Sequence, residues 1–272
     1  MTKRIAPILL VALLVALPAF LQGRSSPPSV AQEAENDARA DQLVDRWIEA
    51  VGGREAFSEL RTARYTLTTE LYEADTGRLR RARPRYVTLA KTPQGNLTRI
   101  ERWEGNDFIV QTWDGDTVRA TMNGEPLGPG DKDWDETAYV SGDVHYWMGL
   151  PYKLRDPGVN LHYVGEDQGM ELVGVSFGEG VGLHDGDQWR YWFEEGRTWP
   201  TRVAYREEGR ENWNVLSFQD VQQVGDYVYV GARVHYEDEG EGGVWKILRT
   251  VDLEWNPELR EGTFDEPGTS TP

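Results

Sequence analysis

The sequence predicts an α+β domain, with a curved antiparallel sheet of about eleven strands and two helices, one N-terminal and one in the middle of the chain, on its concave face. Three observations lead to this prediction. One amphipathic helix lies near the N-terminus, and strand patterns follow it in hairpin pairs. The chain lacks the regular alternation of strands and helices that would indicate a parallel sheet. An antiparallel sheet of this width curls, so its concave face needs the cover that the two helices can supply.

The first element is a helix predicted over residues 38–51. Its apolar residues recur at spacings of three and four and form one stripe, made of Leu43, Val44, Trp47, Ile48 and Val51. Asn36 or Asp37 can cap its start, and Gly52-Gly53 suits a left-handed end. A short second helical turn follows over 54–60. A helix with a single apolar stripe must pack that stripe against another apolar surface. The large antiparallel sheet is the surface that the sequence offers.

The strands come in pairs separated by turn residues such as Asp114-Gly115 and Asn123-Gly124. Pro84 interrupts the second strand and predicts a bulge or a sheet edge there. Residues 125–132 are predicted to form a loop. The predicted strands cover residues 62–74, 79–91, 97–103, 108–113, 117–122, 160–166, 170–177, 188–194, 201–206, 213–220, 227–236 and 244–255.

Residues 134–150 break the strand pattern and are predicted to be helical. Their apolar side chains form a second stripe around Gly142, made of Tyr139, Val140, Val144, Trp147 and Met148. Pro151 directly follows the predicted end of this helix. The middle helix is therefore the second element able to cover the concave face.

Residues 1–31 have the features of a secretory signal. Lys3 and Arg4 begin it, residues 5–20 are almost wholly apolar, and Ser29-Val30-Ala31 offers small residues for cleavage. The apolar run is shorter than the ~20 residues that a membrane span needs, which favours a cleaved signal. An uncleaved membrane anchor is the alternative. We therefore expect export to the periplasm, a single domain over 32–260 that does not span the membrane, and a disordered tail over 261–272.

The charge balance argues against two classes of partner. The chain carries 29 Lys and Arg against 46 Asp and Glu, a formal net charge of −17, whereas nucleic acids and anionic membrane surfaces require a positive patch. Cysteine is absent, which excludes disulfides, thiolate metal sites and a lipid-modified N-terminal cysteine. Stability must therefore come from burial of apolar side chains, among them 11 Trp, 12 Tyr and 7 Phe.

No motif strongly predicts catalysis or metal binding. Ser176 lies in a G-x-S-x-G pattern over 174–178, but a Gly-rich loop and a strand follow it instead of the helix that a nucleophile elbow needs. His184 beside Asp185 and Asp187 could contribute to a metal site, and a polar turn is the favoured interpretation. We expect no catalytic residue, no metal and no cofactor. A hydrolase built on Ser176 or His184 is the least favoured alternative.

Three stretches resemble the outer-membrane lipoprotein-sorting proteins of the LolA/LolB-like superfamily, in an exported branch of it. They are the helix end at 50–53 with Phe57 and Leu60 behind it, the segment 146–158 (YWMGLPYKLRDPG), and the loop and hairpin over 180–193. Together with the order of strands they span nearly the whole chain after residue 31. The resemblance implies a half-barrel sheet with helices across its concave side, and between them a hydrophobic cavity that accepts acyl chains.

The resemblance thus favours a non-enzymatic, monomeric binding or carrier protein whose partner is a lipid acyl chain or a lipoprotein. An exported scaffold or protein-interaction domain with a filled interior is the alternative, because aromatic residues also dominate ordinary cores. If a cavity exists, Trp47→Asp should weaken ligand binding. The candidate cavity residues are Leu43, Trp47, Ile48, Val51, Tyr65, Leu67, Tyr146, Trp147, Met148, Leu150 and Tyr191.

Overall fold

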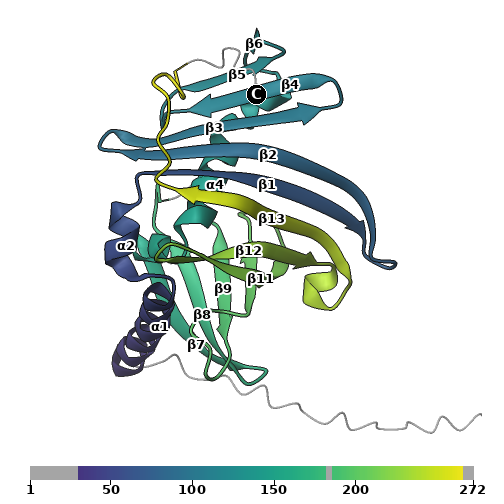
Figure 1. Ribbon diagram of the computed structural model, residues 1–272. Helices are drawn as coiled ribbons and strands as arrows, with labels where there is room; N and C mark the ends of the chain where they lie inside the picture. Colours follow the sequence, from purple (N-terminus) through teal and green to yellow (C-terminus); the bar gives the residue numbers. More distant parts are fainter. Residues whose placement is uncertain (1–29, 182–185, 266–272) are drawn as a thin grey trace, which may run out of the picture.

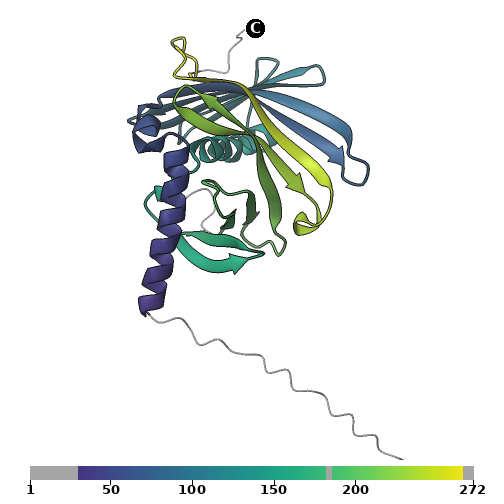
Figure 2. The ribbon, with the colours of Figure 1, turned by 60° about the horizontal axis from the view of Figure 1, so that its bottom comes forward.

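An antiparallel sheet of thirteen strands dominates the computed structural model, which describes residues 30–181 and 186–265. The strands lie in the order β6-β5-β4-β3-β2-β1-β13-β12-β11-β10-β9-β8-β7, so the first and last strands pair at the centre (Figure 1). In Figure 2 the sheet curls around the teal helix α4, with the purple helix α1 at the margin of the curve. The predicted curved, mostly antiparallel architecture is confirmed.

The strands that build this sheet are β1 (Thr62–Glu73), β2 (Arg78–Thr92), β3 (Gly95–Glu104), β4 (Asp107–Trp113), β5 (Val118–Met122), β6 (Glu125–Leu127), β7 (Val159–Asp167), β8 (Met170–Phe177), β9 (Gln188–Phe193), β10 (Arg202–Arg206), β11 (Asn214–Val224), β12 (Tyr227–Tyr236) and β13 (Val244–Trp255). The helices are α1 (Val30–Ala50), α2 (Gly53–Glu59), α3 (Lys132–Asp135) and α4 (Thr137–Gly149), with 3₁₀ turns η1 (Tyr152–Arg155) and η2 (Asp238–Gly240).

The predicted count of about eleven strands was too low, and even the twelve predicted ranges omit one of the thirteen strands. Part of the predicted loop over 125–132 forms the short edge strand β6, in which Pro126 pairs with Thr121 of β5. Proline signals in this stretch argue against a strand, yet a proline is tolerated on the outermost strand, where no further neighbour needs its N–H. Pro84 lies beyond the last β2–β3 pair, Tyr86 with Glu101, so β2 has there the local edge that the sequence predicted.

The helices differ from the prediction at their ends. α1 begins at Val30, so Asn36 and Asp37 lie within the helix and do not cap it. The alanine, glutamate and glutamine residues that precede Asn36 are good helix formers, which explains the earlier start. The single middle helix predicted over 134–150 is divided into α3 and α4, which meet at Glu136. The predicted signal over 1–31 and the tail over 261–272 fall largely outside the described residues.

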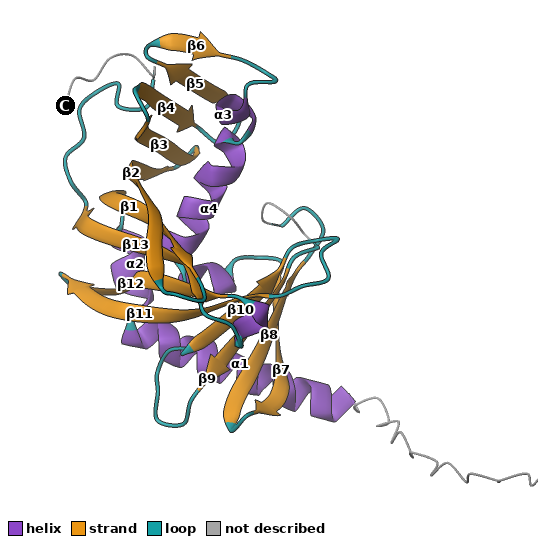
Figure 3. Ribbon diagram, turned by 90° about the vertical axis from the view of Figure 1, so that its right-hand side faces the viewer, coloured by secondary structure: helices purple, strands orange, loops and turns teal. Residues whose placement is uncertain are grey.

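Helix α1 packs its apolar stripe on the concave side of strands β7–β9. Leu43, Val44, Trp47 and Ile48 are at most 2% exposed, as expected for a stripe pressed against a sheet. Outside the stripe, Arg39 Nε donates a hydrogen bond of 2.6 Å to Glu171 on β8. Figure 3 shows α1 running beneath β7–β9.

The carboxyl end of α1 is tied to two further elements. The Val51 carbonyl oxygen accepts a hydrogen bond of 3.2 Å from the Val228 N–H of β12 and one of 3.3 Å from the Tyr152 hydroxyl of η1. α1 therefore holds η1 against the sheet. Within the described ranges, none of the helices is long and apolar enough to cross a membrane.

Helix α4 covers the concave face because of the strand order. β6 and β7 are consecutive in the chain but form opposite edges of the sheet, so the connection between them must cross its whole width. Crossing on the concave side buries Val144 of α4 among Tyr65, Val87 and Ile100. Gln111 on β4 fixes the start of α4, since its side-chain amide donates to the Thr137 hydroxyl at 3.1 Å.

The turn from α1 into α2 depends on Gly52. Its φ of +120° is strained for any residue with a side chain, and an added Cβ would lie 2.5 Å from the Asp226 carbonyl oxygen. Gly52→Ala is expected to lower the free energy of unfolding by about 2–3 kcal/mol in urea titration. Gly105→Ala is the control, because its φ is +66° but no atom lies within 4 Å of the added Cβ. Equal losses in the two variants would contradict the proposed clash with Asp226.

Candidate ligand-binding cavities

A cluster of aromatic side chains fills the concave face where α1 and α4 meet the sheet. The ring centroids of Trp47 on α1 and Trp147 on α4 lie 6.0 and 6.4 Å from that of Phe218 on β11. Trp189 on β9 stacks on Tyr205 at 4.8 Å and lies 5.2 Å from Trp147. Such contacts lock both helices to the sheet, and large rigid rings leave space between them where they do not interlock.

Among the cavities lined by residues that the structure describes, three lie around the carboxyl-terminal half of α4. We call them the central cavity (about 70 Å³), the aromatic cavity (about 280 Å³) and the side cavity (about 260 Å³). The central and side cavities share Phe57 and Met148, whereas the central and aromatic cavities share Trp147. The central and side cavities thus adjoin along one α4 side chain, Met148, and one α2 side chain, Phe57.

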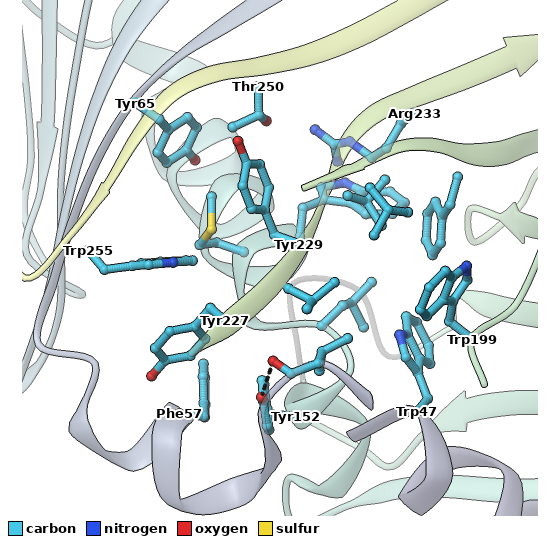
Figure 4. Close-up of a pocket in the computed structure, with 18 of the residues that line it drawn as sticks. Trp47, Phe57, Tyr65, Tyr152, Trp199, Tyr227, Tyr229, Arg233, Thr250 and Trp255 are labelled. Carbon is cyan, nitrogen blue, oxygen red and sulfur yellow. Dashed lines mark hydrogen bonds between the residues drawn. The ribbon is translucent and has the colours of Figure 1, made fainter. Parts of the chain in front are cut away.

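The central cavity lies between α1, α2 and α4 and strands β11–β13 (Figure 4). All its lining residues are apolar or aromatic except Arg233 and Thr250. An apolar wall with a few convergent polar groups is typical of a site for a small apolar or amphipathic ligand. The labelled aromatic lining residues in Figure 4 are Trp47, Phe57, Tyr65, Tyr152, Trp199, Tyr227, Tyr229 and Trp255.

The side cavity has an apolar base and a cationic rim. Ala63 and Leu89 of the sheet and Met148 of α4 line its base, and its rim includes Lys91 and Lys153. The Lys91 ammonium lies 3.4 Å from the centroid of the Phe57 ring, a favourable cation–π geometry. Burial, together with the positive charge of Lys153, lowers the pKa of Lys91 to about 8.

The aromatic cavity has the most carboxylates of the three. Its rings are accompanied by four carboxylates, those of Asp143, Asp156, Asp187 and Glu207. Asp143 accepts a hydrogen bond of 2.8 Å from the Trp147 indole N–H, and burial raises the pKa of this carboxyl. A chain of methylene groups gains more by burial against the apolar wall of the central cavity and the apolar base of the side cavity than beside these carboxylates.

The eleven predicted cavity residues separate into three groups. Trp47, Val51, Tyr65, Leu67, Trp147, Met148 and Leu150 line the central cavity. Tyr146 lines the aromatic cavity together with Trp147, and Met148 also lines the side cavity. The remaining three, Leu43, Ile48 and Tyr191, are at most 1% exposed and belong to the packed core beneath α1.

Strand β12 supplies cavity residues that the sequence analysis missed. Tyr227, Tyr229 and Arg233 line the central cavity, with Thr250 and Trp255 from β13. The signal was present in the period of two along β12, which puts Tyr227, Tyr229 and Arg233 on one face of the strand. It was missed because the pairing of β13 with β1, which brings β12 beside the long first hairpin, leaves no local pattern in the sequence.

The weak catalytic motif lies in an ordinary strand. Ser176 sits near the end of β8, and the chain continues from there as a loop toward β9 without forming a helix up to residue 181. His184 and Asp185 lie outside the described residues. Among the residues that the structure describes, no group of three His, Asp or Glu side chains is placed to hold a metal ion.

Comparison with solved structures finds proteins whose fold is similar to that of this chain. A DUF1329 family protein from Desulfovibrio piger superposes with a TM-score of 0.53 at 7% identity, covering 83% of this chain and 97% of its own. A putative outer membrane lipoprotein-sorting protein domain from Vibrio parahaemolyticus covers 85% and 97% with a TM-score of 0.47 at 10% identity. The LolA superfamily protein NE2245 from Nitrosomonas europaea covers 84% and 97%, with a TM-score of 0.47 at 7% identity.

At these identities the likeness concerns the fold. No protein-family model matches the sequence, and comparison with curated proteins finds no relative. The DUF1329 family protein thus shares the fold of this chain, and the comparison shows no more than that. Any function must be argued from the cavities of this chain.

Proposed function

We propose that this protein binds an apolar chain, such as the acyl chain of a lipid or of a lipoprotein, between its concave face and helix α4. It acts as a binding or carrier protein in the periplasm and performs no chemistry on its ligand. The signal-like segment over 1–31 supports the location. The observation that carries the proposal is the pair of adjoining cavities, central and side, around Met148.

The size and lining of these cavities suit a flexible apolar ligand. The side cavity of about 260 Å³ approaches the 300–1,000 Å³ typical of small-molecule sites, and the central cavity extends it past Phe57. Each methylene group that leaves water for such walls contributes about 0.8 kcal/mol. The sheet and the helices are held together elsewhere, by the core beneath α1 and by the contacts of Val144, so the space need not be filled for the fold to persist.

The purified protein is expected to bind N-phenyl-1-naphthylamine, a neutral dye whose fluorescence rises in apolar surroundings. The rise should saturate with dye concentration, and dodecanol should reverse it by competing for the same cavities. Fluorescence titration measures both effects. Native mass spectrometry of protein purified from its own host should also reveal a co-purified lipid.

Two results would contradict the proposed function. One is a fluorescence rise that does not saturate, since adsorption to exposed apolar surface gives no defined stoichiometry. The other is saturable dye binding that dodecanol leaves unchanged, since the dye would then occupy a site unable to hold an acyl chain. A co-purified protein in place of a lipid would favour an envelope scaffold.

A further inference from the structure

The concave face carries positive charge on three strands, β2, β12 and β13. The strand registers align Arg85 of β2 with Leu67 of β1 and Thr250 of β13, and align Arg83 with Thr69, Leu248 and Arg233 of β12. The next row on this face contains Arg81, Leu71, Lys246 and His235. Because side chains alternate along a strand, all these residues share the face that also holds the cavities. This cationic patch consists of Arg81, Arg83, Arg85, Arg233 and Lys246.

Three members of the patch have no carboxylate partner. Arg81 and Arg83 approach Glu104 at 3.3 and 3.8 Å, whereas Arg85, Arg233 and Lys246 form no ion pair and no side-chain hydrogen bond with any described residue. Arg233 is only 7% exposed, and its Nη1 atom is buried without a partner. Burying a cation without an ion partner is unfavourable by several kcal/mol, so such a group calls for an explanation beyond packing.

The surroundings of Arg233 attenuate its charge only in part. Its guanidinium lies 4.1 Å from the centroid of the Trp147 ring, which provides a cation–π contact. The nearest acidic group on α4 is Asp143, which already accepts the Trp147 N–H, and Glu207 faces Lys246 from beyond β10. Burial and the charge of Arg233 lower the pKa of Lys246 to about 8, as expected where cations crowd together.

Arg233 stands at one end of the central cavity. Figure 4 shows its guanidinium turned toward Thr250 and Tyr229, while Phe57 lies at the far end of the same cavity. The wall between Arg233 and Phe57 is apolar and aromatic, and the side cavity begins at Phe57. The central cavity is therefore cationic at the Arg233 end and apolar or aromatic along nearly all the rest, a polarity that matches an amphiphile with an anionic head.

We propose that Arg233, with Lys246 on the neighbouring strand β13, binds the phosphate, sulfate or carboxylate head of an amphiphile whose apolar chain extends through the central cavity to Phe57. This inference rests on the proposed function and adds the charge of the ligand to it. Arg81 is exposed and Arg83 is partly buried, so the patch leads from solvent to Arg233 and guides the head inward. The protein is strongly acidic overall, so a local positive patch also selects this face for anions.

The test compares three probes by isothermal titration calorimetry at pH 7: dodecyl phosphate, dodecanol and inorganic phosphate, with the amphiphiles below their micelle concentrations. Dodecyl phosphate is expected to bind about tenfold to a hundredfold more tightly than dodecanol, the range that one charge-assisted hydrogen-bonded contact provides. Inorganic phosphate alone should bind far more weakly than dodecyl phosphate. Added salt should weaken binding of dodecyl phosphate and leave dodecanol nearly unchanged.

The variant Arg233→Gln should reduce the affinity for dodecyl phosphate to that for dodecanol, without changing the affinity for dodecanol. Arg64→Gln is the matched control, because Arg64 lies on the opposite face of β1, exposed and paired with Glu254 at 2.6 Å. If Arg233→Gln does not fold, Lys246→Gln on the neighbouring strand should shift the affinity in the same direction. Circular dichroism establishes the folding of each variant.

Failure of this inference can be told apart from failure of the proposed function. If dodecanol and dodecyl phosphate bind equally and Arg233→Gln changes neither, the head subsite is wrong and the apolar site stands. If inorganic phosphate binds as tightly as dodecyl phosphate, the patch is a site for free phosphate and the amphiphile is wrong. If neither amphiphile binds, the proposed function itself is overturned.

Discussion

The free energy of unfolding is expected to fall as the pH is lowered below about 6.5, because the fold holds two histidines in their neutral form. Burial lowers the pKa of His145 to about 4 and that of His235 to about 2. The unfolded chain binds these protons near pH 6.5, so between that value and the lowered pKa it holds more protons than the folded protein. Each histidine then removes about 1.4 kcal/mol of stability per pH unit.

Other titrating groups modify this pH dependence but do not reverse its sign just below pH 6.5. Burial raises the pKa of Asp143, so as the pH falls this carboxyl takes up its proton earlier in the folded protein than in the unfolded chain. This protonation stabilises the fold and offsets part of the stability that the two histidines remove at low pH. Lys91 and Lys246 have a pKa of about 8, so they are already charged in both states below pH 7 and contribute no slope there. The steepest loss is thus expected between pH 6.5 and 4.

The variant His235→Leu isolates one of the two histidines. His235 is 1% exposed, and neither ring nitrogen has a hydrogen-bond partner among the described residues. Leucine of similar size removes these unsatisfied groups, so the variant should be about 1–3 kcal/mol more stable at pH 7. Its advantage should grow by about 1.4 kcal/mol for each unit below pH 6.5, as urea titrations at pH 7, 6 and 5 measure.

The exposed His162 on β7 provides the control. His162→Leu makes the same substitution at an exposed position, so it separates the effect of burial from that of the substitution itself. A constant difference between wild type and His235→Leu from pH 7 to 5 would show that His235 protonates equally in the folded and unfolded protein. The proposed burial of a neutral imidazole would then be wrong.

The elements that local chemistry determines were predicted from the sequence. The stripe of α1 and its end at Gly52-Gly53 follow from helical spacing and from the ease with which glycine takes positive φ. Twelve of the thirteen strands lie close to their predicted ranges, because alternation and turn residues are visible within a few positions. β6 was missed, since three residues with a central proline carry no periodicity.

The features that depend on distant pairing were not predicted. The pairing of β1 with β13 joins the two halves of the sheet. It places Thr250 and Arg233 beside Tyr65, although these residues are far apart in the chain. Consequently the walls of the central cavity from β12 and β13 could not be anticipated. The unpartnered cations were hidden for the same reason, because each arginine of β2 alone resembles an ordinary surface residue.

The position of Trp47 changes how its substitution must be interpreted. Trp47→Asp was expected to weaken ligand binding, but Trp47 is 2% exposed and its ring contacts Tyr191, Phe193 and Phe218. A carboxylate at this position would have no partner and would destabilise the core beneath α1. Loss of binding in that variant would therefore not distinguish a blocked site from an unfolded one. Variants that fill the cavities without removing core contacts are more informative.

Filling the passage between the central and side cavities is expected to abolish most binding of an apolar chain. Met148→Trp places a larger ring where the two cavities adjoin, and Ala63→Leu adds three carbons to the side cavity from the opposite wall. Displacing two methylene groups of a bound chain costs about 1.6 kcal/mol, so each variant should bind dodecanol more than tenfold more weakly. Competition with the neutral dye measures this loss, and thermal unfolding measures whether the variant remains folded.

Two controls separate a blocked passage from a general disturbance. Met148→Leu conserves volume and should keep both stability and affinity nearly unchanged. Gly142→Leu fills the aromatic cavity instead, because Tyr139, Gly142 and Tyr146 share one face of α4, and leucine also raises helix propensity there. If Gly142→Leu abolishes dodecanol binding while folded Met148→Trp and Ala63→Leu retain it, the chain lies beside the carboxylates of the aromatic cavity. Because Arg233 lines the central cavity and not the aromatic cavity, it would then have no contact with the head of the ligand, so these substitutions test both proposals through the position of the chain.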